Sequence, residues 1–180
     1  MKITTEDIQV GFHARQILKG ISIESKDKEL VGIIGPNGSG KSTLVNLIPR
    51  FYDVTEGSIT LDGIDIREMT QQELRSKLGY VPQKGVLFSG TIGSNIMFGN
   101  PDGNEQDMEE AAKIAQATEF IDTKSKKYDS TISQGGRNVS GGQKQRLSIA
   151  RAIAKHPKLL FSMTVFQHWI IRQMQHFVQS

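Results

Sequence analysis

The alternation of hydrophobic and polar positions predicts a strand-rich first half of the chain. Ile21 and Ile23 alternate with polar neighbours, as in a half-buried strand. The run Glu-Leu-Val-Gly-Ile-Ile at 29–34 is almost continuously apolar, which is typical of a strand buried on both faces. A helical stretch is expected over 41–48. Strands are expected over 3–10, 17–25, 29–34, 58–61 and 78–81.

Helical spacing dominates the second half. Residues 105–118 carry apolar side chains three to four positions apart, which predicts one helix. A second helix is expected to begin after Ser140-Gly141-Gly142 and to run to Lys155, because Pro157 disfavours helical geometry in the residue before it. Residues 158–161 begin another buried strand. The section from about 90 to 131 is therefore expected to be a mostly helical insert in a strand-rich core.

Composition excludes several classes of protein. The chain has 180 residues, a formal charge of +3, 37% hydrophobic residues and no Cys, so it is expected to be one globular domain or a piece of a larger one, without disulfides or thiolate metal sites. No apolar run approaches the roughly 20 residues that span a bilayer, and the first residues do not form a signal peptide. The cluster Lys124-Ser125-Lys126-Lys127 is expected to be a solvated loop, so we predict no nucleic-acid partner.

The strongest chemical signal is a phosphate loop after the run at 29–34. The pattern G-x-x-x-x-G-K-[ST] requires a strand before it and a helix after it, and the predicted elements supply both. Glycines let backbone N–H groups converge on phosphate oxygens, the lysine supplies a cation, and the hydroxyl can ligate Mg²⁺. We expect ATP to bind here, with the helix residue Thr43 also in contact. The motif consists of Gly35, Pro36, Asn37, Gly38, Ser39, Gly40, Lys41 and Ser42.

A second glycine motif lies at the start of the later helix. Val139 is followed by Ser140, Gly141, Gly142 and Gln143; the glycines expose backbone N–H groups, and Ser140 can cap the helix or bind an anion. Together with the phosphate loop, this segment resembles the Leu-Ser-Gly-Gly-Gln signature of ATP-binding cassette (ABC) ATPases, with Val139 in place of the Leu.

The resemblance extends from about residue 3 to 161 and implies further site residues. Gln83 occupies the position of the family's Q-loop glutamine, which contacts Mg²⁺ and faces the membrane partner. Phe12 occupies the position of an aromatic residue that stacks on adenine. Residues 87–96 resemble exporter cassettes, and the segment Ser133-Gln134-Gly135-Gly136 resembles the exporter loop that senses the membrane domain.

The resemblance implies an α/β fold: a P-loop NTPase core of ABC type with an antiparallel β edge and a helical subdomain, incomplete at the C-terminus. We expect one nucleotide-binding domain over 1–160, with a core over about 1–89, a helical subdomain over about 90–155 and an aberrant tail over 161–180. The cofactors would be ATP and Mg²⁺, with Ser42 and Gln83 as metal contacts. The partners would be a second cassette, packed head to tail, and the transmembrane domain of an exporter, which would hold the chain at the cytoplasmic face of the cell membrane.

The acids of an intact cassette are missing after the strand at 158–161. Phe161, Ser162, Met163 and Thr164 stand where the family has an Asp and a catalytic Glu or Asp. We therefore assign no catalytic residue, and we expect weak binding and negligible turnover. His168 and His176 are not assigned as a switch histidine, because the family's D-loop is absent before them.

The genetic code offers a reason for the missing acids. If the tail is translated one base out of frame, the codons of Met163-Thr164, His168-Trp169 and Trp169-Ile170 force Asp, Leu and Asp. The remaining positions permit two apolar residues and then Asp-Asp-Ser-Val-Ser-Ala-Leu-Asp, which is the family's pattern in register. Our hypothesis is that residues from about 161 are a frameshifted translation of an intact cassette; a divergent C-terminal helix is the alternative.

The function of the chain as a whole has more than one interpretation. No membrane helices precede the cassette, so we expect a fragment that begins at an internal Met or a separately encoded cassette. A module that binds ATP-Mg²⁺ without hydrolysing it is a second interpretation. A soluble ABC ATPase without a transport role is a third, which the exporter-like stretch at 87–96 disfavours.

Overall fold

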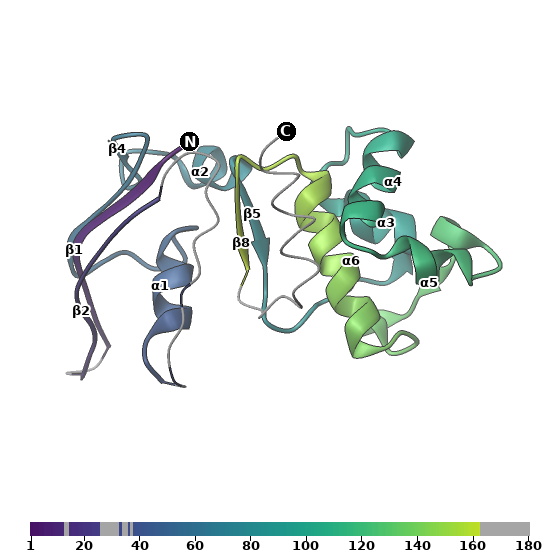
Figure 1. Cartoon of the computed structure of the whole chain (residues 1–180), viewed down its shortest axis with the longest axis horizontal. Coiled ribbons are helices and arrows are strands. Elements are labelled where there is room, and N and C mark those ends of the chain that lie inside the picture. Colours follow the sequence, from purple (N-terminus) through teal and green to yellow (C-terminus); the bar gives the residue numbers. More distant parts are fainter. Residues whose placement is uncertain (13–14, 26–32, 34–35, 37, 163–180) are drawn as a thin grey trace. The chain divides into compact units, whose positions relative to one another are not determined.

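The computed structural model describes residues 1–12, 15–25, 33, 36 and 38–162, except for the side chain of Phe12. The chain divides into two compact units, Met1–Leu78 and Gly79–Ser180, and each is described by itself (Figure 1). The strand expected over 29–34 falls largely outside the described residues, as does the tail after Ser162.

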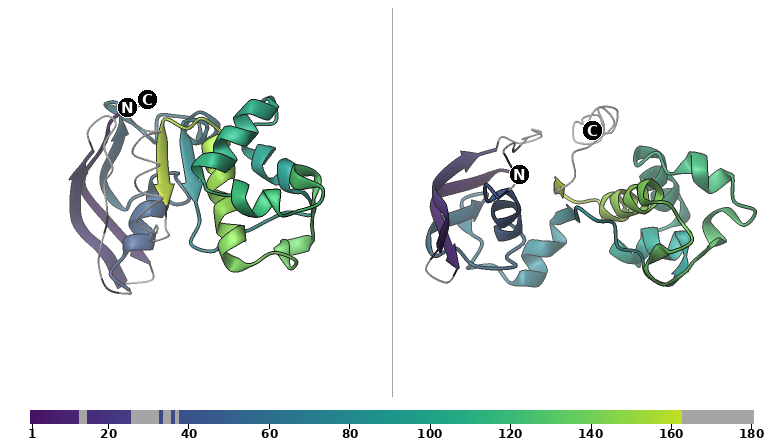
Figure 2. Two further views of the ribbon diagram at one scale, coloured as in Figure 1. Left: turned by 45° about the vertical axis from the view of Figure 1, so that its right-hand side comes forward. Right: turned by 90° about the horizontal axis from the view of Figure 1, so that it is seen from below.

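Unit 1 contains a four-stranded antiparallel sheet in the order β2-β1-β3-β4 (Figures 1 and 2). It confirms the antiparallel β edge expected from the sequence. Asp62 and Gly63 join the last two strands with φ of 51° and 83°, the left-handed geometry of a tight hairpin turn. The strands are β1 Ile3–Phe12, β2 Arg15–Glu24, β3 Glu56–Leu61 and β4 Ile64–Asp65.

A bulge in β1 changes which of its residues face the core. Ile3 and Thr5 are buried at odd positions, whereas Ile8 and Val10 are buried at even positions. The register with β2 shifts between Thr5 and Ile8, and Asp7 between them has φ of 44°. One extra residue reverses the side-chain alternation, so the bulge keeps apolar side chains on the same face along the whole strand.

Two helices complete unit 1. Helix α1, Lys41–Leu47, lies beside one face of the sheet and buries Leu44 and Leu47 (Figures 1 and 2). Helix α2, Gln71–Ser76, begins at Thr70, whose hydroxyl accepts a hydrogen bond from the Glu73 amide. This side-chain cap satisfies one of the free N–H groups at the helix start.

Unit 2 is built around one long helix, α6, Gly141–Ala154. It lies between the strand pair β5–β8 and the shorter helices α3, α4 and α5 (Figures 1 and 2). A short antiparallel ladder, β6–β7, joins the two ends of the helical insert. The elements are β5 Leu78–Val81, β6 Gly90–Thr91, α3 Ile92–Ile96, α4 Glu105–Ile114, α5 Thr118–Asp122, β7 Thr131–Ile132 and β8 Leu159–Ser162, with 3-10 turns at Met97–Gly99, Lys127–Asp129 and Gln134–Gly136.

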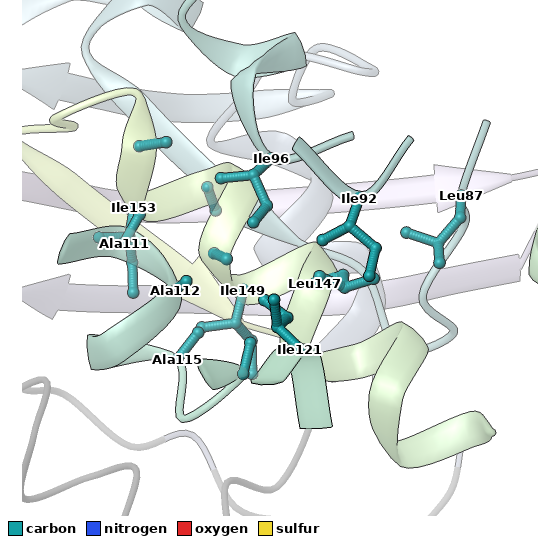
Figure 3. Close-up of a cluster of buried hydrophobic side chains, with 14 of the residues drawn as sticks. Leu87, Ile92, Ile96, Ala111, Ala112, Ala115, Ile121, Leu147, Ile149 and Ile153 are labelled. Carbon is teal, nitrogen blue, oxygen red and sulfur yellow. The ribbon is translucent and has the colours of Figure 1, made fainter. Parts of the chain in front are cut away.

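The core of unit 2 forms where the helices meet (Figure 3). Small residues of α4 allow it to pack closely on α6, and branched residues of α3 and α6 fill the remaining space. This core fixes α6 firmly in the unit. Its labelled members are Leu87, Ile92, Ile96, Ala111, Ala112, Ala115, Ile121, Leu147, Ile149 and Ile153.

The single helix expected over 105–118 is wrong, because the structure divides it into α4 and α5. Gln116 has φ of 51°, which no α-helix continues through, and the Ala117 amide bonds to the Ala112 carbonyl at 2.8 Å. Ala115 and Ala117 are both fully buried at this break, so packing of the small residues overrides their helical spacing. The helix expected to begin after Gly142 and to run to Lys155 is confirmed, although it begins at Gly141 and ends at Ala154. The strand expected over 158–161 is confirmed as Leu159–Ser162.

Candidate functional site

The described part of the phosphate loop enters α1 through glycines in left-handed geometry. Gly38 and Gly40 have φ of 81° and 87°. A Cβ on Gly40 would lie 2.7 Å from a methyl of Leu18 and 3.5 Å from the Ile17 carbonyl oxygen, whereas one on Gly38 would meet no atom within 4 Å. Gly40 is therefore required for its backbone conformation and for the close approach of the loop to β2. Gly35 and Asn37 lie outside the described residues.

Lys41 folds back over the loop that precedes it. Its Nζ donates hydrogen bonds to the Pro36 carbonyl oxygen at 2.6 Å and to the Ser39 hydroxyl at 3.4 Å. The ammonium group therefore already lies beside the backbone that would surround a phosphate. The Ser42 side chain is exposed, so its hydroxyl is accessible from solution.

The start of α1 suits an anion. No side chain caps the helix at Gly40, and its first turn holds no acidic residue. The first N–H groups of a helix have no intrahelical acceptor and carry a partial positive charge. With Lys41 beside them, these N–H groups fit the phosphates of a nucleotide. Thr43, which we expected among the contacts, lies in this first turn.

The predicted adenine contact is described only in its backbone. Phe12 ends β1 and pairs with Arg15 of β2. Its side chain lies outside the described residues, so stacking on adenine stays a prediction.

Gln83 follows β5 and is exposed. The loop that carries it packs directly on α6, because a Cβ on Gly85 would lie 2.7 Å from the Lys144 carbonyl oxygen and 2.8 Å from the Ser148 hydroxyl oxygen. The resemblance to the family assigned a role to Gln83 and none to Gly85. The signal was weak, because a glycine after a strand is typical of any turn.

The signature segment forms a capped helix start. Ser140 Oγ accepts a hydrogen bond from the Gln143 amide at 3.2 Å, and Gln143 Oε1 accepts one from the Ser140 amide at 3.0 Å. This is a reciprocal capping box. Gly141 and Gly142 are exposed, and a Cβ on either would meet nothing within 4 Å. Packing inside this chain therefore does not require glycine at these positions.

The loop before the signature is held by Asn138. Its Oδ1 accepts hydrogen bonds from the amide and the hydroxyl of Ser133, and its Nδ2 donates to the Thr131 carbonyl. Gln134 is exposed, and Gly135 and Gly136 both have φ of 67°. The segment 133–136, which resembles the exporter loop that senses the membrane domain, thus forms a turn shortly before the start of α6.

The described residues do not place the acids of a complete ATPase site. Strand β8 ends at Ser162, and the positions that follow lie outside the described residues. Among the residues that are described, no group of three or more His, Cys, Asp or Glu side chains could hold a metal ion.

The phosphate loop and the signature segment are matched by known proteins. The profile of the ABC transporter family matches residues 18–162. The chain is 42% identical over 158 residues to an ATP-dependent lipid A-core flippase of Desulfotalea psychrophila, covering 88% of this chain and 28% of the flippase. It is 41% identical over 161 residues to a multidrug efflux ATP-binding/permease protein of Mycobacterium bovis, covering 89% of this chain and 14% of that protein.

A solved structure is similar over nearly the whole chain. A bacterial Atm1-family ABC exporter with ATP bound matches with a TM-score of 0.90 and 37% identity, covering 99% of this chain and 32% of the exporter chain. The chain thus spans less than a third of each of these relatives. Helices in the described part of the chain are all too short or too polar to cross a membrane. With the family profile matching most of its length, the chain belongs to the ABC transporter family.

Proposed function

We propose that the chain is the nucleotide-binding part of an ABC exporter, in which ATP binding and hydrolysis are coupled to transport across a membrane. The observation that supports the proposal is the start of α1, where an uncapped helix, left-handed Gly38 and Gly40 and the folded-back Lys41 would suit a phosphate. The names of the relatives, a flippase and a multidrug efflux ATP-binding/permease protein, support export as the process.

Each part of the site has a proposed role. Lys41 would contact the β- and γ-phosphates, and the amides of residues 38–42 would surround the phosphate oxygens. Ser42 and Gln83 would hold Mg²⁺, which shields phosphate charge when bound. Phe12 would stack on adenine.

A second copy of the cassette is the proposed partner for the signature. Gly141 and Gly142 face open space, so their lack of side chains admits a close approach from outside the chain. The start of α6 would meet the nucleotide of a cassette packed head to tail. The membrane partner would be a transmembrane domain, and the chain would act at the cytoplasmic face of the cell membrane.

Calorimetric titration of the 180-residue chain with ATP and Mg²⁺ tests the proposal. Lys41→Ala removes a charged donor, so we expect affinity to fall by about 30-fold or more. Lys19→Ala, an exposed lysine of β2, is the matched control and should bind as the unchanged chain does. Equal affinities in all three proteins would contradict the phosphate site.

Binding without hydrolysis is the second candidate for the chain as written. Phe161 and Ser162 end β8 at positions where the frame-corrected reading has two apolar residues, and Met163-Thr164 stands where that reading has the two acids. We propose that this chain binds ATP and releases no phosphate. A phosphate-release assay at saturating ATP tests this, and turnover that Lys41→Ala abolishes would refute it.

The frameshift hypothesis has its own test. DNA sequence across the codons for 157–180 and beyond should open, after a one-base correction, a frame that reads Asp-Asp-x-x-Ser-Ala-Leu-Asp. Codons that forbid Asp or Ala at the free positions would rule the hypothesis out.

A further inference from the structure

Arg151 lies on α6, the helix that begins at the signature segment (the signature helix), and its side chain hydrogen-bonds to both ends of the segment 86–95. Its Nη1 donates to the Val86 carbonyl oxygen at 2.9 Å, and its Nε donates to the Asn95 carbonyl oxygen at 2.9 Å. Its Nη2 donates to Asn95 Oδ1 at 2.8 Å. These distances are those of well-formed hydrogen bonds, and the acceptors lie at both ends of the turn.

Asn95 extends this network through the inside of the turn. Its side chain is 1% exposed, and its Nδ2 donates to the carbonyl oxygens of Phe88 and Thr91, each at 2.9 Å. Its Oδ1 accepts from the Phe88 amide at 2.9 Å as well as from Arg151. A buried polar network with every group bonded is rigid and specific in shape. The turn and α6 are thus joined through fixed hydrogen bonds.

Two exposed aromatic rings lie on the same guanidinium. The ring centroids of Phe88 and Phe98 are 4.6 Å apart, and Arg151 Cζ lies 4.9 Å and 5.7 Å from them. Burial lowers the pKa of Arg151 from its ordinary value, and no ion pair joins it to a carboxylate within the described ranges. The charge is therefore stabilised by carbonyl oxygens and ring faces, which suit a planar guanidinium better than an ammonium.

A second contact lies one turn of α6 earlier. Gly85, directly before Val86, packs against the Lys144 carbonyl and the Ser148 hydroxyl. Lys144, Ser148 and Arg151 are spaced four and three residues apart, so they lie along one face of α6. The Gln83 loop therefore contacts the signature helix at two successive helical turns, through Gly85 at Lys144 and Ser148 and through Val86 at Arg151.

We infer that Arg151 is a positioning residue, which holds the loop carrying Gln83 on the signature helix so that Gln83 and Ser140–Gly142 move as one rigid element. The inference rests on the proposed function, in which Gln83 contacts Mg²⁺ and the signature contacts a nucleotide. In this proposal Arg151 would contact neither the Mg²⁺ nor the nucleotide. It would fix the position of the Gln83 loop relative to the signature segment through its hydrogen bonds to Val86 and Asn95.

Hydrogen exchange of the full chain without nucleotide gives the first test. Arg151→Lys keeps the charge and loses the three-point fork, so amides of 86–95 should exchange about tenfold faster, while those in the middle of α4 and α6 keep their rates. Arg137→Lys, at an exposed arginine of the same unit, is the control and should change no rate. Gly85→Ala should speed the same amides, and the double variant should fall short of the summed effects.

The dependence of ATP affinity on Mg²⁺ gives the second test. The gain in affinity that Mg²⁺ provides should fall about tenfold in Arg151→Lys, with Mg²⁺-free ATP affinity unchanged, because only the placement of Gln83 is altered. A general loss of stability would lower both affinities together.

These outcomes separate the inference from the proposed function. Unchanged exchange at 86–95, or a uniform increase across unit 2, would overturn the role of Arg151 even if ATP binds. An unchanged Mg²⁺ gain in Arg151→Lys would overturn it as well. Failure of the unchanged chain to bind ATP would overturn the proposed function, and the exchange rates would still decide whether Arg151 holds the loop.

Discussion

Helices α1 and α6 both have glycines at their starts, yet the two starts are built differently. At α1 the N-cap is Gly40, with φ of 87° and no side-chain cap. At α6 the N-cap is Ser140, with φ of −68° and reciprocal hydrogen bonds to Gln143. One start leaves its N–H groups without a side-chain acceptor, and the other bonds its amides with its own side chains.

The comparison shows that the two motifs need glycine for different reasons. Gly40 is explained inside the chain, because left-handed geometry and Leu18 leave no room for a Cβ. Gly141 has neither restriction, so its identity points to something outside the chain. Replacing Gly40 should therefore disturb folding, whereas replacing Gly141 should leave folding intact.

The largest effect on stability is expected for Gly40→Ala. Left-handed φ and the close approach to Leu18 should together cost about 2–3 kcal/mol in the free energy of unfolding. Gly38→Ala has similar φ and open space, so it should cost about 1 kcal/mol. Urea denaturation of the full chain measures both. Equal losses would show that the contact with β2 does not matter.

A smaller loss is expected when the cap of α6 is removed. Ser140→Ala deletes the acceptor for the Gln143 amide and should lower the free energy of unfolding by about 1 kcal/mol. Ser140→Asp keeps an acceptor and should retain most of the stability. The same denaturation assay compares them, and a neutral Ser140→Ala would remove the contrast between the two helix starts.

Gly141→Ala should act in the opposite direction. Alanine is a better helix former and meets no atom here, so stability should rise by about 0.5 kcal/mol. Sedimentation with ATP and Mg²⁺ then tests the external role, since any nucleotide-dependent association of two chains should weaken. A destabilised monomer would contradict the open surroundings of Gly141.

The smallest expected effect is on stability at low pH, where the capping boxes of α4 and α6 should differ. Helix α4 also has a capping box, but its partner is Asp107, whose carboxylate accepts from the Asn104 amide at 3.0 Å. That hydrogen bond, and a weaker contribution from His156, lower the pKa of Asp107 below its ordinary 3.8. The stabilisation is therefore present above pH 3.8 and is lost as the pH falls through the lower pKa of the folded state.

Asp107→Asn should flatten this acid dependence slightly. Melting temperatures measured between about pH 5 and pH 2 should fall less steeply in the variant than in the unchanged chain. Asp102→Asn, an exposed acid in the preceding turn, serves as control and should follow the unchanged chain. The cap of α6 has no ionisable group, so it should add nothing to the dependence of melting temperature on pH. Identical dependence in the unchanged chain and in Asp107→Asn would disprove the role of Asp107.

Local patterns predicted the elements well where one signal dominated. Residues 3–10, 78–81 and 141–154 form the strands and the helix expected of them. Residues 105–118 do not, because Gln116 takes left-handed geometry between two buried alanines. Alanine satisfies both a helix and a tight break, so its spacing alone cannot distinguish one helix from two.

The sequence by itself determined the family, the phosphate loop and the signature segment, because those motifs are contiguous and their residue types carry the chemistry. Only the tertiary structure decided that Gly85 and Arg151 join the Gln83 loop to α6. Arg151 lies 56 and 65 positions from the residues whose carbonyls accept its hydrogen bonds. Every residue has a backbone carbonyl, so such a contact leaves no mark in the sequence, and folding alone brings its partners together.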